Sequence, residues 1–191
     1  VNIFRRNNSE GSERFSNIES KYILYVGDRR NHKNLYYTIR LIDQINKKYN
    51  ENIVFVIAGS KSYKNYKLQK LISSMSFVLE VINPSDSELD NLYNNCLLTI
   101  LLSKDEGFGI PVIEASSRSK KVVISNIPAL LEVAPESALV LDLQNTSDHI
   151  KMLHDYLKKE VEVNAQLIFK KWSWHFSSIK LKELLLFLIN N

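Results

Sequence analysis

The sequence predicts an α/β protein with a doubly wound, mainly parallel sheet that carries helices on both faces. Short apolar runs, too short for ordinary helices, alternate along the chain with segments of helical period. Strands joined through helices in this way need right-handed crossovers, which make the strands parallel. Four of the five glycines also fall within a few residues after an expected strand: Gly27, Gly59, Gly107 and Gly109. Because ligands of open α/β sheets bind beyond the carboxyl ends of the strands, these glycines should line one crevice.

The expected strands are short runs rich in β-branched and other apolar residues. In chain order they occupy residues 21–26, 53–58, 77–82, 97–102, 121–125 and 138–141. The run at 97–102 is almost entirely apolar, which is typical of a parallel strand buried on both faces. The run at 77–82 gives a weaker signal.

Segments of helical period separate these strands. Helices are expected at residues 35–45, 68–72, 85–93, from 111 onward, at 126–132, at 147–157 and in one long stretch from about 161 to the end. Ser85, followed three residues later by Glu88, predicts a capped helix start. Pro111 predicts the first position of a helix, where its missing N–H is not needed.

The stretch 103–115 carries the strongest signal for a binding site. It leads from the buried strand at 97–102 into the helix that begins near Pro111. Gly107 and Gly109 flank Phe108 just before the helix, which lets the backbone approach a ligand closely. The N–H groups at a helix N-terminus favour an anion through hydrogen bonds and the helix dipole. A phosphate is therefore the expected occupant.

Two acids frame this loop, Glu106 before the glycines and Glu114 eight positions later. A carboxylate beside an anion site would repel phosphate, so both acids should face a neutral group with hydroxyls to donate, such as a ribose or a hexose. The alternative interpretation makes Glu106 a solvated loop acid and Glu114 a first-turn acid that complements the helix dipole.

Cations follow the first expected strand and reach the same rim of the sheet. Arg29 can grip phosphate oxygens with paired donors, and Lys33 supplies a compact charge on a long stem. A diphosphate is the expected ligand of these two side chains. Most short charge runs are solvated loops, and that interpretation is preferred for Arg30.

Composition narrows the class of protein. The 191 residues fit one domain, or one with a small appendage, and 45% hydrophobic with 24% charged residues are ordinary for a globular protein. The net charge of +4 is spread over lysines of expected helices, which could favour phosphates or peripheral contact with an anionic membrane but not nucleic acid. Cys96 lies in an apolar run and is expected to be buried, and the four histidines do not cluster with it as metal ligands.

An ordered series of short motifs resembles one known family. The matching segments are Tyr25-Val26-Gly27 with Lys33-Asn34, Ile57-Ala58-Gly59, Leu89 with Leu92-Tyr93, the E-x7-E stretch 106–115, the stretch 125–133, and Lys171-Trp172-Ser173-Trp174. Over about residues 21 to 185 this series resembles the nucleotide-sugar-binding C-terminal domain of GT-B glycosyltransferases, specifically the retaining family 4. The resemblance implies a Rossmann-like domain that forms one half of a GT-B fold.

The resemblance also implies roles for residues. The donor would be a UDP- or GDP-sugar, with no metal and no cofactor. Glu114 would hydrogen-bond the ribose, Glu106 would lie near the transferred hexose, and Lys33 with Arg29 would neutralise the leaving diphosphate. The donor-binding set is completed by Gly27, Gly107, Phe108, Gly109 and Ile110. Arg29 stands one position after the usual arginine of the family, because Asp28 follows Gly27 directly.

The same resemblance implies that the acceptor-binding N-terminal domain is missing. Residues 1–20 are then an interdomain connector and 21–191 the donor-binding domain, with a closing helix from about 161. Such a fragment would bind the donor but transfer nothing alone to its glycan or lipid-linked acceptor. The expected location is the cytoplasm, including the inner face of the membrane. The alternative is a degenerate, non-catalytic module that binds a protein partner, because Ser119 and Lys121 replace residues common in the family.

Overall fold

The computed structural model describes residues 21–61, 65–172 and 174–190, and its centre is one parallel sheet. The strands are β1 (Tyr22–Val26), β2 (Val54–Gly59), β3 (Val78–Ile82), β4 (Leu98–Leu101), β5 (Lys121–Ser125) and β6 (Leu139–Leu141). They lie in the order β3-β2-β1-β4-β5-β6, and each neighbouring pair is parallel. The predicted fold class is confirmed.

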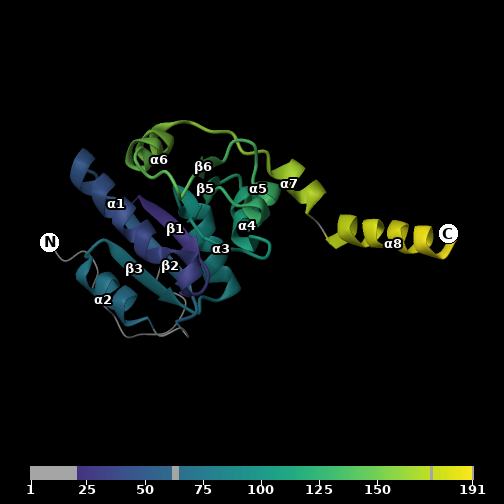
Figure 1. The fold of residues 1–191 in the computed structure, drawn as a ribbon, viewed down its shortest axis with the longest axis horizontal. Helices are drawn as coiled ribbons and strands as arrows, with labels where there is room; N and C mark the ends of the chain where they lie inside the picture. The colour runs from purple at the N-terminus through teal and green to yellow at the C-terminus, as the bar shows by residue number, and fades with distance from the viewer. Residues whose placement is uncertain (1–20, 62–64, 173, 191) are drawn as a thin grey trace.

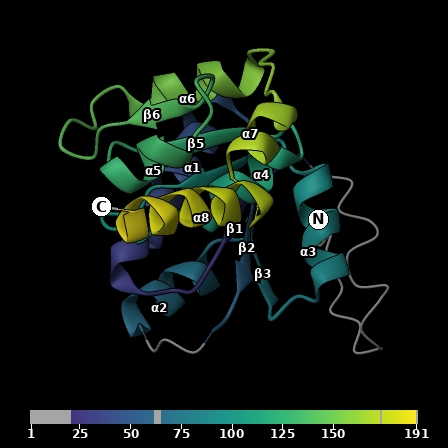
Figure 2. The same ribbon diagram turned by 90° about the vertical axis from the view of Figure 1, so that its right-hand side faces the viewer.

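Helices cover both faces of this sheet (Figures 1 and 2). They are α1 (Leu35–Tyr49), α2 (Tyr66–Ser74), α3 (Asp86–Asn95), α4 (Ile110–Ser117), α5 (Pro128–Val133), α6 (His149–Lys158), α7 (Ala165–Lys171) and α8 (Trp174–Asn190). Helices α1, α2 and α6 lie on one face, and α3, α4 and α5 lie on the other. Right-handed crossovers explain this division, because the chain moves from β1 toward β3 and then from β4 toward β6 in the opposite direction.

The core lies where the central strands meet the helices. Ile23, Leu24, Phe55 and Ile100 are fully buried, as expected for strands covered on both faces. Cys96 is also buried, as its apolar surroundings in the sequence predicted.

Two predicted helix starts can be compared with the structure. The capping box of α3 is confirmed: the Ser85 side chain accepts from the Glu88 N–H, and the Glu88 carboxylate accepts from the Ser85 N–H. Pro111 is the second residue of α4, not the first, because Gly109 is the N-cap and Ile110 opens the helix. The second position tolerates proline for the same reason, since its N–H would have no partner inside the helix.

The C-terminal region differs from the prediction of one long helix from about 161. Helix α7 begins at Ala165 and ends at Lys171, and α8 follows from Trp174. Trp172 caps the end of α7 outside the helical conformation, and its ring packs edge-on against Phe108. Helix α8 extends away from the body of the domain (Figure 1), and its residues Leu181, Leu184, Leu185, Leu186 and Phe187 are 49% to 63% exposed.

The expected connector at residues 1–20 lies outside the described residues.

Candidate functional site

The sheet has its reversal point between β1 and β4. These strands are neighbours, yet the chain leaves β1 toward β2 and leaves β4 toward β5. The loops that follow them therefore separate, and a crevice opens between them, which is where α/β sheets bind ligands. The 3-10 helix η1 (Asn31–Lys33) lies in the first of these loops. The backbone N–H of Lys104 in the second loop donates to the carbonyl of His32 at 2.7 Å, so the two loops are joined.

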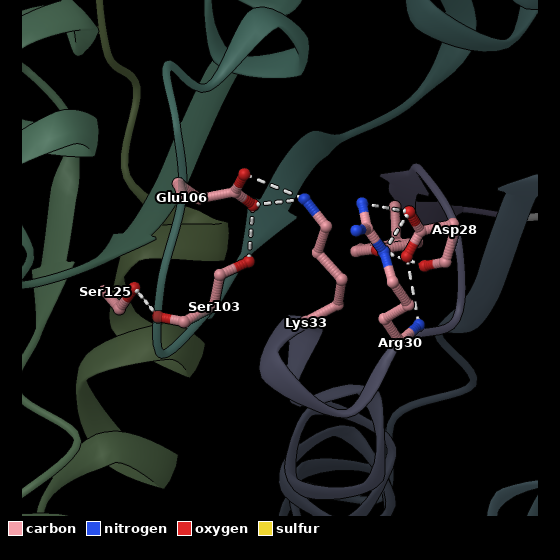
Figure 3. A network of polar contacts seen from close by, with 7 residues as sticks. Asp28, Arg30, Lys33, Ser103, Glu106 and Ser125 are labelled. Carbon is pink, nitrogen blue, oxygen red and sulfur yellow. Dashed lines mark hydrogen bonds and ion pairs between the residues drawn. The ribbon is translucent and has the colours of Figure 1, made fainter. Parts of the chain in front are cut away.

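Lys33 and Glu106 meet across this crevice. The Lys33 ammonium lies 2.8 Å from both carboxylate oxygens of Glu106, and the two side chains are only 14% and 8% exposed (Figure 3). Ser103 also donates to Glu106 Oε1 at 2.7 Å, and Ser125 donates to the Ser103 carbonyl. The Glu106 carboxylate is thus held from two sides. Its charge is neutralised by Lys33, so the acid repels a nearby anion much less than an unpaired carboxylate would.

A second ion pair lies on the other side of Lys33 (Figure 3). The Asp28 carboxylate accepts from the Arg30 side chain at 2.7 Å and from the Arg30 backbone N–H at 3.0 Å. Burial raises the pKa of Asp28, but the hydrogen bonds from Arg30 outweigh that effect and lower the pKa overall. The solvated Arg30 expected from the sequence is confirmed, since its side chain is 56% exposed, but its ion pair with Asp28 was not predicted. The signal was the opposite charge two positions away in a loop that must turn tightly.

The loop before α4 is shaped by Gly109. This residue caps the helix with φ of +91°, and a Cβ there would lie 2.7 Å from Leu130 Cδ2. Only glycine fits this position without strain. Among the described residues, none accepts a hydrogen bond from the N–H of Gly107, Phe108 or Gly109. A Cβ at Gly107 would meet nothing within 4 Å, so the loop is open where a ligand would approach.

Two apolar side chains of this loop are exposed. Phe108 is 43% and Ile110 is 58% exposed. The Phe108 ring packs edge-on against Trp172, with ring centroids 5.2 Å apart, so the donor loop predicted from the sequence contacts the end of α7. This contact was not predicted from the sequence, because 64 positions separate the two residues.

Glu114 is the fifth residue of α4, which begins directly after Gly109. Its Oε2 accepts a 2.7 Å hydrogen bond from the hydroxyl of Tyr93 in α3. Burial, and then the adjacent Glu114, raise the pKa of Tyr93, so the phenol keeps its proton and acts as the donor. Tyr93 appeared in the sequence only as part of a matching segment, and its contact with Glu114 could not be foreseen.

Arg29 does not join Lys33 and Glu106. Its side chain is 1% exposed, donates to the Ser60 carbonyl at 2.5 Å and forms a 3.0 Å ion pair with Glu80. The guanidinium is therefore directed toward β2 and β3, where the half-buried Glu80 carboxylate and the Ser60 carbonyl hold it. The structure thus places the Arg29 guanidinium away from Lys33, unlike the arrangement expected from the sequence.

Gly27 directly follows β1 and lies beside Gly59, the last residue of β2. A Cβ at Gly59 would lie 2.3 Å from the Gly27 carbonyl oxygen, and the Gly27 N–H donates to the Ala58 carbonyl at 2.9 Å. These glycines let two strand ends approach closely at the rim of the sheet.

Two adjoining cavities lie along α1 on the described surface. They measure about 580 and 480 Å³ and share Tyr36 and Arg40 in their walls. The smaller one reaches Lys104 at the edge of the crevice, but neither is lined by Lys33, Glu106 or Glu114. Of the predicted site residues, Arg29 lines the smaller cavity.

Within the described residues, no group of three or more His, Cys, Asp or Glu side chains lies close enough together to hold a metal ion. The expected independence from metal stays a prediction. The helices in the part of the chain that the structure describes are also too short or too polar to span a bilayer.

The sheet and its reversal-point crevice define a Rossmann-like domain of the kind found in GT-B glycosyltransferases. Sucrose-phosphate synthase from Thermosynechococcus elongatus superposes with a TM-score of 0.71 at 16% identity, over 90% of this chain and 46% of that one. Residues 9–171 match the family model of glycosyl transferases group 1. The chain belongs to this family.

Curated relatives include two O-antigen enzymes. The O-antigen chain mannosyltransferase RfbU of Salmonella typhimurium is 32% identical over 130 residues, which cover 65% of this chain and 35% of that protein. The O-antigen chain mannosyltransferase B of Escherichia coli is 26% identical over 161 residues, covering 80% of this chain and 42% of that protein. This chain thus spans about 35% to 42% of the length of these relatives.

Proposed function

We propose that this chain is the donor-binding half of a retaining, family 4 glycosyltransferase that transfers a hexose from a UDP- or GDP-sugar to a glycan or lipid-linked acceptor. The observation that carries the proposal is the arrangement at the crevice. Lys33 lies against the glycine loop, whose backbone amides are free, and Glu106 with Glu114 of α4 resembles the E-x7-E motif.

The chemistry requires charge stabilisation on both sides of the bond that breaks. As the glycosidic C–O bond breaks, positive charge develops on the sugar and negative charge on the diphosphate leaving group. Lys33 and the N–H groups of Gly107, Phe108 and Gly109 stabilise the diphosphate, and Glu106 faces the hexose. In this assignment, Lys33 gives up one of its two hydrogen bonds to Glu106 when the diphosphate binds.

Glu114 accepts hydrogen bonds from the ribose hydroxyls, while Gly27 and the exposed Ile110 border the nucleotide. Arg29 has a structural role in this proposal, because Ser60 and Glu80 already hold its guanidinium. Metal is not required, since Lys33 and the backbone amides carry the charge that a cation would otherwise neutralise.

The biological setting follows from the relatives. Their names identify O-antigen mannosyltransferases, so we infer a role in bacterial surface-polysaccharide assembly with a mannosyl donor as the first candidate. Because the chain spans less than half of these relatives, the acceptor is proposed to bind a separate N-terminal domain. The cytoplasmic location and the peripheral contact with an anionic membrane stay predictions.

Calorimetric titration of the 191-residue chain with UDP, GDP, UDP-glucose and GDP-mannose tests the proposal. We expect the wild type to bind one of the two nucleotide series. Lys33→Ala and Glu114→Ala should each weaken binding about tenfold or more, because each removes a contact of a charged group. Lys47→Ala is the control, since the Lys47 side chain is 73% exposed in the last turn of α1. No binding by the wild type, or equal binding by all variants, would reject the proposal.

A non-catalytic module that binds a protein partner is the second candidate. The exposed apolar side chains of α8 favour it, because such surfaces commonly mark interfaces. The same titration separates the two candidates: this module would bind neither nucleotide series.

A further inference from the structure

We propose that Tyr93 is a positioning residue for donor binding: its buried hydroxyl holds Glu114 in the orientation that grips the ribose of the nucleotide. The inference rests on the proposed function of Glu114. It goes further by assigning the discrimination between ribose and its deoxy forms to a pair of residues on two different helices.

The hydrogen bond links a fully buried residue, Tyr93, to a partly exposed one, Glu114. Tyr93 lies near the end of α3 and is 0% exposed. Its hydroxyl is 2.7 Å from Glu114 Oε2 in α4. A glutamate on a helix ordinarily samples several rotamers, and ordering such a side chain has an entropic cost. Because Tyr93 holds the carboxylate before any ligand arrives, that cost does not fall on the binding step.

The hydrogen-bond inventory leaves Glu114 able to hold a diol. An ionised carboxylate has about four acceptor positions, and the single phenol hydrogen occupies one of them. In the described part of the chain, Oε1 accepts from no residue. A ribose offers its 2′- and 3′-hydroxyls as two adjacent donors, which suits the remaining positions of one carboxylate. Tyr93 thus fixes one oxygen and leaves the other free.

Arg118 secures the same pair from the far end of α4. Its Nη1 donates to the Glu114 carbonyl at 2.8 Å, and its Nε donates to Asp90 of α3 at 2.9 Å. The guanidinium also lies over the Tyr93 ring, 5.1 Å from the centroid. These contacts tie α3 to α4, so the Tyr93 hydroxyl and the Glu114 backbone keep a constant separation.

The competing explanation is that Glu114 only satisfies a buried phenol. Tyr22 supplies the matched control, because it is equally buried and its hydroxyl donates to the Leu92 carbonyl at 2.7 Å. Tyr22→Phe deletes a buried hydroxyl that is bound to Leu92, the residue before Tyr93 in α3. It leaves the hydrogen bond to the Glu114 carboxylate unchanged.

The experiment is a titration of the wild type, Tyr93→Phe and Tyr22→Phe with two ligands. The first ligand is UDP or GDP, whichever the wild type binds more tightly, and the second is its 2′,3′-dideoxy analogue. We expect Tyr93→Phe to bind the ribonucleotide about tenfold more weakly, as loss of one hydrogen bond to a carboxylate implies. It should bind the dideoxy analogue as the wild type does, and Tyr22→Phe should match the wild type with both.

A Glu114→Gln background completes the test. If Tyr93 acts through the carboxylate, adding Tyr93→Phe to Glu114→Gln should produce no further loss. An equal loss for both ligands in Tyr93→Phe, or no loss for either, would overturn the inference. If Glu114→Gln weakens ribonucleotide binding while Tyr93→Phe does not, the inference fails and the proposed function stands. If the wild type binds neither nucleotide, the proposed function fails and takes the inference with it.

Discussion

Lys33 and Glu106 show what a single pair of residues contributes at this site. They are 73 positions apart in the chain, yet their charged groups are 2.8 Å apart and their side chains are only 14% and 8% exposed. Removing one partner of such a pair leaves the other charge without compensation, whereas removing both can be nearly neutral. The pair therefore stabilises the empty site and keeps both groups ready for a ligand.

A double-mutant cycle at these positions measures that stabilisation. Lys33→Met should lower the free energy of unfolding by about 1–3 kcal/mol, because Glu106 would keep only Ser103 as a neutral partner. Lys33→Met with Glu106→Gln should recover most of this loss. Urea unfolding checks both values.

The matched control is the exposed pair of Lys151 with Asp155, where Lys151→Met should leave the free energy of unfolding nearly unchanged. Equal losses at the two pairs would contradict the view that Lys33 and Glu106 are coupled in a partly buried site.

At the scale of elements, α4 connects the glycine loop to Glu114. The helix starts where it does because Gly109 adopts a left-handed backbone conformation between the side chains of Leu130 and Val133. Those residues belong to α5, so the cap of one helix depends on the packing of the next. The position of the loop amides is consequently set by α5 as much as by the loop itself.

Substituting the two glycines tests this dependence. Gly109→Ala should lower the free energy of unfolding by about 1–3 kcal/mol, because its Cβ would overlap Leu130 and the backbone would be strained. Gly107→Ala should change it by no more than about 0.5 kcal/mol, since a Cβ there meets nothing within 4 Å. Chemical denaturation of the two variants gives the comparison, and similar losses would contradict it.

At the scale of the whole molecule, α6 closes the fold by packing on α1. Two aromatic contacts join these helices: the Tyr37 hydroxyl lies 2.7 Å from His149 Nδ1, and the Tyr49 and His154 rings stack with centroids 3.5 Å apart. His149 is buried, and this burial lowers its pKa below the ordinary value of 6.5, although Asp142 and Asp148 act in the opposite direction.

This burial predicts a pH dependence of stability. Because the pKa of His149 is lower in the folded state, the unfolded state takes up the proton first as the pH falls through the ordinary value of 6.5. The contribution of neutral His149 is therefore present above that pH and is lost below it. We expect the free energy of unfolding to decrease between about pH 7.5 and about pH 5.5. His149→Gln should flatten this dependence, measured by urea unfolding.

His32→Gln is the comparison, because His32 lies in the loop after β1 and has no part in the α1–α6 contact. A slope that stays the same in His149→Gln would show that other groups cause the pH dependence.

The sequence by itself determined the order of strands and helices along the chain, the capping box of Ser85 with Glu88, and the position of the glycine loop. These features depend on local patterns: apolar runs, helical period and turn residues act within a few positions of one another. The bounds of β5 agree with the prediction for this reason. The prediction of one helix from about 161 was wrong, because α7 ends at Lys171, and the contact that Trp172 makes there is with Phe108, a distant residue.

Only the tertiary structure decided which charged groups meet. The sequence placed Arg29, Lys33, Glu106 and Glu114 at one rim, but it could not show that Arg29 turns to Ser60 and Glu80 while Lys33 turns to Glu106. Such choices depend on which strands are neighbours and in what register, since the pairing of β3 with β2 sets Glu80 opposite Ile57. A side chain takes the partner that sheet order brings within reach, and local sequence carries no information about that partner.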